Sequence, residues 1–128
     1  MNLTSLDPDL NHREPKGWSN HPAVKMWRGY EGQLFLYGLA MVDEWRKRGY
    51  NSTLDAKLLL VYNYAFVTGR ASGVDVIPSW IADQSELNKV LDSHRRALLT
   101  KNYGHYSCLS WSQDSGVEPT AYTYYWAV

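Results

Sequence analysis

The stretch at positions 21–50 reads HPAVKMWRGYEGQLFLYGLAMVDEWRKRGY, and its apolar residues recur at spacings of three and four. This period is typical of an amphipathic helix, in which residues three and four apart share a face. One set of large side chains falls on a single face: Trp27, Tyr30, Leu34, Tyr37, Met41 and Trp45. We therefore predict a helix over 22–49, with this face buried against the rest of the chain.

Signals for the start, the end and a possible break of this helix are also present. Pro22 suits the first helical position because its missing N–H group would have no partner there. Gly49 follows three cationic residues and suits a left-handed C-terminal cap. Gly29 and Gly32 weaken the first half, so we expect a break or kink near them.

The composition is that of one soluble globular domain. The chain has 128 residues, enough for one hydrophobic core and too few for two. Hydrophobic residues make up 45% and charged residues 20%, which argues against a disordered chain. Lysine plus arginine and aspartate plus glutamate number 13 each, so the formal net charge is zero. Strong nonspecific binding to nucleic acid is therefore not expected, although a local basic cleft is compatible with zero net charge.

We expect no metal, no cofactor and no membrane span. Cys108 is the only cysteine, which excludes an internal disulfide and a cysteine-built metal site, and the histidines form no HxxxH or HExxH spacing. No apolar run approaches the roughly 18 residues of a membrane span. The opening MNLTSLDPDLNH lacks the apolar region of a signal peptide. We expect a cytoplasmic protein.

The segments on either side of residue 50 differ in character. Residues 1–20 have turn-forming pairs and little apolar periodicity, so we expect an irregular lead-in with Trp18 as its one anchor against the core. A second helix is predicted over 53–68. Ser52 and Asp55 have the spacing of a capping box at its start. Because apolar residues surround this helix on all sides, we expect it to be central.

The last third of the chain predicts one more helix and a tail. Asp83 or Ser85 can cap a third helix that reaches about residue 101. Residues 102–128 have glycine, serine and proline punctuation, no helical period and many aromatics. We therefore predict an all-α fold, an orthogonal helical bundle in a single domain over 1–128. Its helical core would span 21–101, and the extended aromatic tail would wrap the helices.

The third predicted helix carries polar residues where apolar ones are expected. His94 falls at the centre of its apolar stripe, Lys101 falls on the same side, and Arg95 lies at the edge. The simpler interpretation is a core histidine bonded to a backbone carbonyl. The alternative is a polar pocket between this helix and the first, where these three residues cluster with His105 and Tyr106. Such a cluster suits an anionic ligand, because arginine and lysine bind phosphate well.

A polar edge accompanies the aromatic face of the first predicted helix. Its members follow one another at helical spacing: His21, Lys25, Arg28 and Glu31. A solvated helix edge is the ordinary interpretation. The alternative is that this edge faces the same pocket, with Glu31 as the only nearby carboxylate.

Aromatic residues alternate near the C-terminus, at positions 122–126. Packing against the core or an edge strand is the simpler interpretation of Tyr124 and Tyr125. Beside a basic pocket, the same rings would instead stack on nucleic-acid bases.

Three blocks of sequence together resemble a known family. They are NHPAVKMWRGYEGQLFLYGLAMVDEWRKRGY at 20–50, DSHRRALLTKNYGHY at 92–106 and PTAYTYY at 119–125. These blocks resemble the pyrimidine-dimer DNA glycosylases, whose founding members are the phage endonuclease V enzymes. The resemblance is to a less characterised bacterial branch, which also has a segment similar to Pro78–Ile81, and it covers about residues 18–126.

The resemblance implies an all-α fold and a specific chemistry. Founding members cleave the glycosidic bond of a damaged base with the α-amine of an N-terminal threonine, through an imine intermediate. A glutamate on their first helix assists, flanked by arginines that bind phosphates. This chain departs from that pattern because it begins with Met1-Asn2 and has no similar basic helix within 1–17. We expect the N-terminal catalytic helix to be missing.

The expected function is that of a phage or bacterial DNA glycosylase or abasic-site lyase that acts on damaged or modified bases in double-stranded DNA. Imine chemistry would then need another nucleophile, and Lys101 or Lys25 with a lowered pKa is the candidate. Glu31 would act as base or stabilise the sugar cation. His94, Arg95 and His105 would hold phosphate or polarise the leaving base, which must be flipped out of the stack.

Two alternatives remain. The first is a noncatalytic relative that binds nucleic acid, a nucleotide or a partner chain, and such a partner would supply the missing helix. The second is a truncated gene product without activity of its own.

Overall fold

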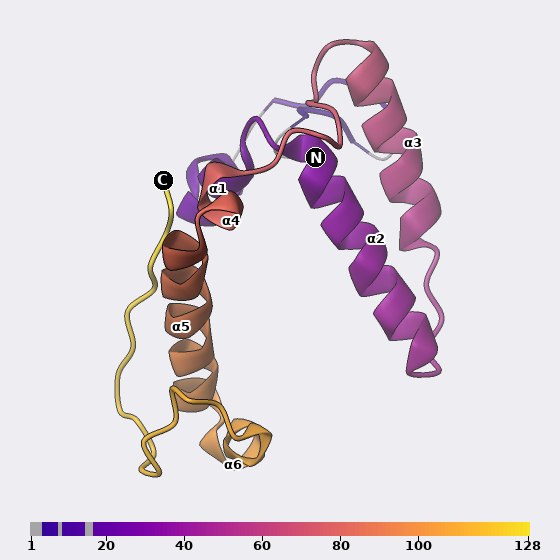
Figure 1. Cartoon of the computed structure of the whole chain (residues 1–128). Coiled ribbons are helices and arrows are strands. Elements are labelled where there is room, and N and C mark those ends of the chain that lie inside the picture. Colours follow the sequence, from indigo (N-terminus) through magenta and orange to yellow (C-terminus); the bar gives the residue numbers. More distant parts are fainter. Residues whose placement is uncertain (1–3, 8, 15–16) are drawn as a thin grey trace. The chain divides into compact units, whose positions relative to one another are not determined.

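The chain folds into helices joined by turns and extended segments (Figure 1). The computed structural model describes residues 4–7, 9–14 and 17–128. In chain order the elements are η1 (Gly17–Asn20), α1 (Pro22–Trp27), α2 (Glu31–Lys47), α3 (Leu54–Val67), α4 (Ser79–Ala82), α5 (Gln84–Lys101), α6 (Tyr103–Tyr106) and η2 (Ser107–Leu109). Within these described ranges the strand-like pairing is a single isolated bridge between Leu6 and His12. The all-α prediction is therefore confirmed.

The chain divides into two compact units, residues 1–78 with residue 128, and residues 79–127. The first contains α1, α2 and α3, and the second contains α4, α5, α6 and the tail. The single-domain organisation and the orthogonal crossing of the helices stay predictions.

The predicted break in the first helix is confirmed at Gly29. Its φ of 85° is left-handed, a conformation that glycine adopts without strain. α1 ends at Trp27, and the N–H of Tyr30 donates to the Trp27 carbonyl at 2.9 Å to close the turn. α2 then begins at Glu31. Gly49 has a φ of 89° directly after α2, which matches its predicted role as the C-terminal cap.

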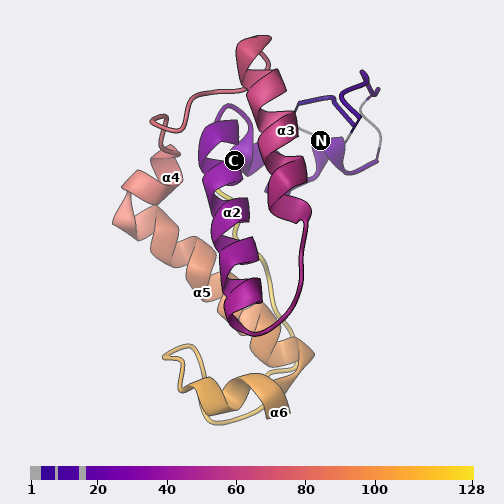
Figure 2. The same cartoon turned by 90° about the vertical axis from the view of Figure 1, so that its right-hand side faces the viewer.

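α2 and α3 form a helical hairpin and lie side by side (Figures 1 and 2). Phe35 stacks on Tyr62 with ring centroids 4.4 Å apart, and Val42 is buried. An added Cβ at Gly38 would lie 2.9 Å from a methyl group of Leu58, so the Leu58 side chain packs directly over this glycine.

The predicted apolar face is half-buried at Trp27, Tyr30 and Leu34, but its later part on α2 is exposed, contrary to the prediction. Tyr37, Met41 and Trp45 are each about half exposed, whereas the neighbouring face with Gly38 and Val42 turns toward α3. The reason is steric, because two helix backbones approach more closely along a side that carries glycine than along one that carries large aromatic rings.

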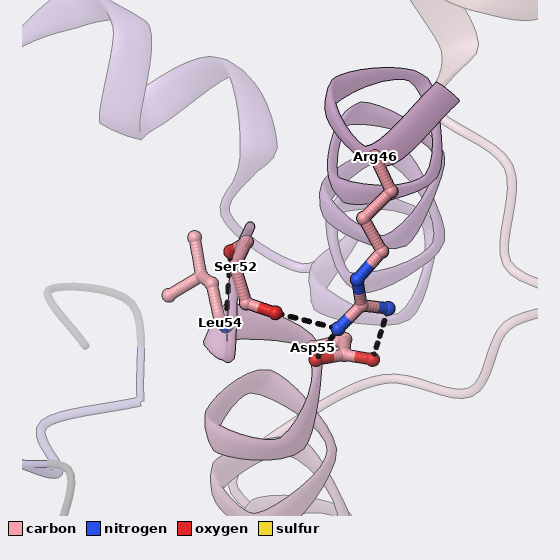
Figure 3. A network of polar contacts seen from close by, with 4 residues as sticks. All are labelled: Arg46, Ser52, Leu54 and Asp55. Atoms are coloured by element: carbon pink, nitrogen blue, oxygen red, sulfur yellow. Dashed lines mark hydrogen bonds and ion pairs between the residues drawn. The ribbon is translucent and has the colours of Figure 1, made fainter. Parts of the chain in front are cut away.

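An arginine–aspartate pair joins the two helices of the hairpin near its turn (Figure 3). The Arg46 guanidinium donates to both carboxylate oxygens of Asp55, at 2.8 and 2.9 Å, and to the backbone carbonyl of Ser52 at 2.6 Å. The Ser52 hydroxyl accepts from the N–H of Leu54 at 3.2 Å. The N-cap residue of α3 is therefore Thr53 and not Ser52 as predicted; Ser52 bonds the first N–H of the helix from one residue earlier, and Asp55 binds Arg46 instead of completing a capping box.

The N-terminal lead-in is part of the core of the first unit. Leu6 is only 2% exposed and packs in one cluster with Val61 and Ala65 of α3. Trp18, the expected anchor, is 67% exposed. The prediction was wrong because residues 1–20 have no apolar periodicity that would mark Leu6 as buried or Trp18 as exposed.

α3 is covered on one side only, which corrects its predicted central position. Val61 and Ala65 are buried, whereas Leu60 is 50% and Val67 is 82% exposed. Within its unit, α2, the N-terminal segment and the loop that follows α3 pack against its covered side. Although α3 is apolar on all sides, neither it nor any other helix in the described ranges is long and apolar enough to cross a membrane.

The second unit is built on α5. Asp83 caps its start, because one carboxylate oxygen accepts from the N–H groups of Ser85 and Glu86, as the sequence predicted. Trp80 of α4 is buried. After η2 the chain returns without regular secondary structure, and it lies alongside α5 as the predicted aromatic tail (Figure 1).

We expect Gly32→Ala to destabilise the first unit severely. A Cβ at this position would lie 2.3 Å from the backbone oxygen of Gly73, and backbone cannot rotate away as a side chain can. The free energy of unfolding should fall by about 2 kcal/mol or more. Gly38→Ala in the same helix is the matched control. The added methyl group would contact only the flexible side chain of Leu58, so the free energy of unfolding should stay within about 1 kcal/mol of wild type. Denaturant unfolding measures both, and equal effects would contradict this account.

The Arg46–Asp55 pair should make stability depend on acid pH. The bond from Arg46 holds the pKa of Asp55 below its ordinary value of 3.8. Because the pKa of Asp55 is lower in the folded state, the pair stabilises the fold fully above pH 3.8. This stabilisation is lost as the pH falls through the pKa of Asp55 in the folded protein. Asp55→Asn should therefore lower the unfolding midpoint at pH 7 and converge with wild type in strong acid. Asp43→Asn, which removes an exposed ion pair with Lys47, is the control and should change little.

Candidate functional site

The η1–α1 segment presents an exposed tryptophan beside a histidine. His21 caps α1, because its Nδ1 atom accepts from the N–H of Ala23 at 3.1 Å. The Trp18 ring lies 4.5 Å from the His21 ring, centroid to centroid. With Gly17 these two residues line an open surface pocket of about 260 Å³. The second face of an exposed indole in such a position can accept another flat ring.

Two cations follow on the same short helix. Lys25 and Arg28 are both exposed, and Arg28 Nη2 donates to the Ser19 carbonyl at 2.8 Å, which joins the end of α1 to η1. The sequence from Gly17 to Tyr30 contains no aspartate or glutamate. This segment is therefore locally positive although the whole chain has no net charge.

Glu31 holds three backbone segments together. Its Oε1 atom accepts from the N–H of Gly29 at 2.9 Å, and its Oε2 atom accepts from the N–H of Ser72 at 3.1 Å. It is half-buried as the first residue of α2, where a carboxylate is favoured by the helix dipole. Both oxygens of the predicted catalytic carboxylate thus bond to the protein's own backbone.

His94 adopts the arrangement of the simpler interpretation, a bond to a backbone carbonyl. Its Nδ1 atom lies 2.8 Å from the carbonyl oxygen of Val90, so Nδ1 carries the proton and donates. The imidazole ring is half-buried between the C-terminal aromatics. Ring centroids of Tyr124 and Trp126 lie 5.0 and 5.3 Å away.

Lys101 anchors the tail to the end of α5. Its ammonium donates to the Tyr124 hydroxyl at 2.8 Å and lies 5.5 and 5.4 Å from the ring centroids of Tyr122 and Tyr124. The hydrogen bond with Tyr124 is the largest of the effects that raise the pKa of Lys101. Imine chemistry requires a lysine with a lowered pKa, so the expected shift is corrected in sign.

The other predicted residues of the second unit also contact its own aromatic rings. Arg95 lies over the Trp111 ring at 5.7 Å, and Trp111 stacks on Tyr106 at 5.6 Å. His105 meets Tyr106 edge-on at 4.8 Å. These contacts fix α6 and the segment after it against the last turns of α5.

A third cluster joins the tail to the start of α5. The Tyr125 hydroxyl donates to Glu86, which also pairs with Lys89 at 2.8 Å. Bonds from Lys89 and then from Tyr125 lower the pKa of Glu86. Because Tyr124 and Tyr125 are neighbours, their side chains reach in opposite directions along α5, toward Lys101 and toward Glu86, from a tail that passes near His94.

The predicted site residues divide between the two units. The first unit carries His21, Lys25, Arg28 and Glu31, and the second carries His94, Arg95, Lys101, His105, Tyr106, Tyr124 and Tyr125. A pocket shared by both sets stays a prediction. Sequence reasoning missed Trp18 as a surface residue, although its polar neighbour Asn20, which is exposed, was a signal. In the described part of the chain no three histidine, cysteine, aspartate or glutamate side chains are grouped to hold a metal ion.

Comparison with known proteins supports the resemblance in the first half of the chain. A family model described as pyrimidine dimer DNA glycosylase matches residues 3–58. Searches of curated proteins and of solved structures found no match. The matched stretch begins and ends earlier than the expected 18–126, and it contains Trp18 and the whole predicted polar edge. The match favours a function related to DNA repair, while the bacterial branch and the missing helix stay predictions.

Tyr124→Phe tests the cause of the raised Lys101 pKa. The substitution keeps the ring and removes the hydroxyl, so the pKa of Lys101 should fall toward its ordinary value of 10.5. NMR titration of the lysine ε-carbon measures it. Tyr122→Phe, which keeps the bond to Tyr124, should have a smaller effect. A wild-type pKa below 10.5 would contradict the structure and restore Lys101 as a candidate nucleophile.

Proposed function

We propose that this chain is a DNA-repair protein that binds damaged DNA through the surface formed by η1 and α1. The observation that carries the proposal is the exposed Trp18 beside His21, Lys25 and Arg28, in a segment free of acidic residues. This segment lies within the stretch that matches the pyrimidine dimer DNA glycosylases. Binding of damaged DNA by that family supports DNA as the partner.

The residue types fit contact with a damaged duplex. Lys25 and Arg28 supply positive charge for backbone phosphates. Trp18 supplies an aromatic face for stacking on a base, a contact that tolerates any base because every base has a flat face. Damage weakens stacking and pairing, so a base at a lesion is displaced at lower cost than one in an intact duplex. The surface would therefore prefer damaged DNA.

Glycosidic bond cleavage is the second candidate function, and the family match favours it. Glu31 would then have to exchange a backbone hydrogen bond for a contact with substrate. Lys101, with its raised pKa, is a poor nucleophile at neutral pH. We therefore place damage binding first and give Lys101 no covalent role.

The second unit supplies further candidate contacts. We propose Arg95, His105 and Tyr106 as additional phosphate-binding residues, since they lie at or next to exposed positions on α5 and α6. His94, Tyr124 and Tyr125 would support them by holding the tail. A partner chain that provides the missing helix is a separate proposal, and it would matter only for cleavage.

Substitutions on η1 and α1 should distinguish the contribution of base stacking to DNA binding from the contribution of positive charge. Trp18→Ala should weaken binding to a duplex with one thymine dimer by about tenfold, and change binding to the intact duplex little. Lys25→Gln should weaken both and reduce the slope of log affinity against log salt by about 0.9. Fluorescence anisotropy of labelled duplexes measures these effects. Lys47→Gln, at the far end of α2, is the control for charge alone.

Two results would overturn parts of this proposal. Equal losses for Lys25→Gln and Lys47→Gln would remove α1 as the contact surface, and a wild-type salt slope near −8 would indicate a large basic surface elsewhere. Borohydride trapping on abasic DNA tests catalysis separately. Trapping that Lys101→Gln abolishes would favour the enzyme with a lysine nucleophile.

A further inference from the structure

Arg28 makes a specific contact with η1 in addition to the charge that it brings to the surface. Its Nη2 atom donates to the backbone carbonyl of Ser19 at 2.8 Å, nine positions earlier in the chain. Ser19 is buried, with 7% of its surface exposed, whereas Arg28 itself is exposed. The bond therefore joins an exposed side chain at the end of α1 to a buried part of η1.

Two consecutive carbonyls of η1 are bonded to the α1 segment. The Trp18 carbonyl accepts from the N–H of His21, the N-cap residue of α1, at 2.9 Å. The Ser19 carbonyl accepts from Arg28, the C-cap residue of the same helix. Because each peptide group is planar, these two bonds fix the orientation of the two peptide groups that follow Trp18.

The position of the Trp18 ring depends on this backbone. The side chain is 67% exposed, so few neighbouring side chains fix it. Its ring contact is with His21, at 4.5 Å between centroids and 41° between planes. The direction of an exposed side chain follows from its backbone and from the rotamers that the backbone allows. The Trp18 ring is therefore held against His21 by the backbone of η1, which Arg28 in turn fixes at Ser19.

A fixed aromatic ring and a positive charge act differently on damaged and intact DNA. Attraction of phosphates by a cation is the same for both duplexes, because both carry the same backbone charge. Stacking acts on a base that has left its place in the duplex, which a lesion makes easier. A ring that is already held in place loses less conformational entropy when it stacks. A residue that fixes Trp18 would therefore increase the preference for damage.

We propose that Arg28 is a positioning residue, which holds Trp18 for base stacking and so sets the preference for damaged DNA. This role rests on the proposed function of the η1–α1 surface. The charge of Arg28 attracts phosphates from a distance, as the charge of any cation does. Its bond to Ser19 depends instead on the long, planar guanidinium, which lysine does not reproduce.

Arg28→Lys separates the bond from the charge. Lysine keeps the charge, but its side chain is shorter and its ammonium is strongly hydrated, so the fixed bond to Ser19 should be lost. NMR of the free protein should then show weaker nuclear Overhauser contacts between the rings of Trp18 and His21, with the amide resonances of α2 and α3 unchanged. Arg48→Lys, at an exposed arginine paired with Glu44, is the matched control. Unchanged ring contacts in Arg28→Lys would overturn the positioning role without any DNA measurement.

A duplex with one thymine dimer and the matching intact duplex test the effect on binding. Arg28→Lys should weaken binding to the dimer duplex by about three- to tenfold more than binding to the intact duplex. The slope of log affinity against log salt should stay the same, because the charge is kept. Equal losses on the two duplexes would indicate a phosphate contact that lysine makes less well, and would contradict the proposal.

The double variant Trp18→Ala with Arg28→Lys tests whether Arg28 acts through Trp18. Its affinity for the dimer duplex should equal that of Trp18→Ala alone, because no ring is left to position. Additive losses would show that Arg28 acts independently of Trp18 and would overturn the proposal. Failure of the proposed function has a different result. Wild-type protein would then bind the two duplexes equally, while Arg28→Lys would still lose the ring contact in the free protein, which would leave Arg28 as a structural residue of η1.

Discussion

The first unit depends on the contact between the start of α2 and the segment that follows α3. Ser72 is the centre of this contact. Its N–H donates to Glu31, its hydroxyl accepts from the N–H of Gly32, and its carbonyl accepts from the Tyr62 hydroxyl. Glu31 also binds Gly29, so one carboxylate joins the turn after α1 to a loop about forty residues later. This contact therefore joins the turn after α1, the start of α2 and the loop after α3.

Burial strengthens this contact and restricts the residues that can form it. Burial is the main effect that raises the pKa of Tyr62, so its hydroxyl stays protonated and can donate to Ser72 at any physiological pH. Gly32 is required because the loop backbone at Gly73 lies where a Cβ would stand. A carboxylate that bonds two backbone amides in this way is part of the fold first. Any catalytic use of Glu31 would have to break one of these hydrogen bonds, and that cost is why we propose damage binding ahead of cleavage.

The helix positions could be predicted from the sequence because their signals are local. Pro22, Gly29, Gly49 and Asp83 each act through backbone geometry or a cap within a few residues, and each behaves as predicted. The buried face of α2 could not be predicted in the same way. Apolar periodicity marks the aromatic side, but the choice between two apolar sides is made by the partner helix, which packs on the glycine side. Residues 1–20 also have no repeating apolar pattern that indicates which side chain is buried. Trp18 was expected to be buried and is exposed, whereas Leu6 is buried.

The predicted site residues show the same division between local and distant causes. Helical phase placed His94 and Lys101 on one side of α5, and both contact Tyr124. The direction of the Lys101 pKa shift could not be read from the helix, because its cause is a hydroxyl twenty-three residues later in the chain. Lys101, Lys89 and Arg95 each lie over an aromatic ring of their own unit. A cation in such a contact gives up part of its interaction when it turns to a phosphate. On α1, Arg28 already donates to the Ser19 carbonyl, so it too would exchange an existing contact for a phosphate, and the proposed DNA surface depends on Lys25 and Trp18 more than on Arg28.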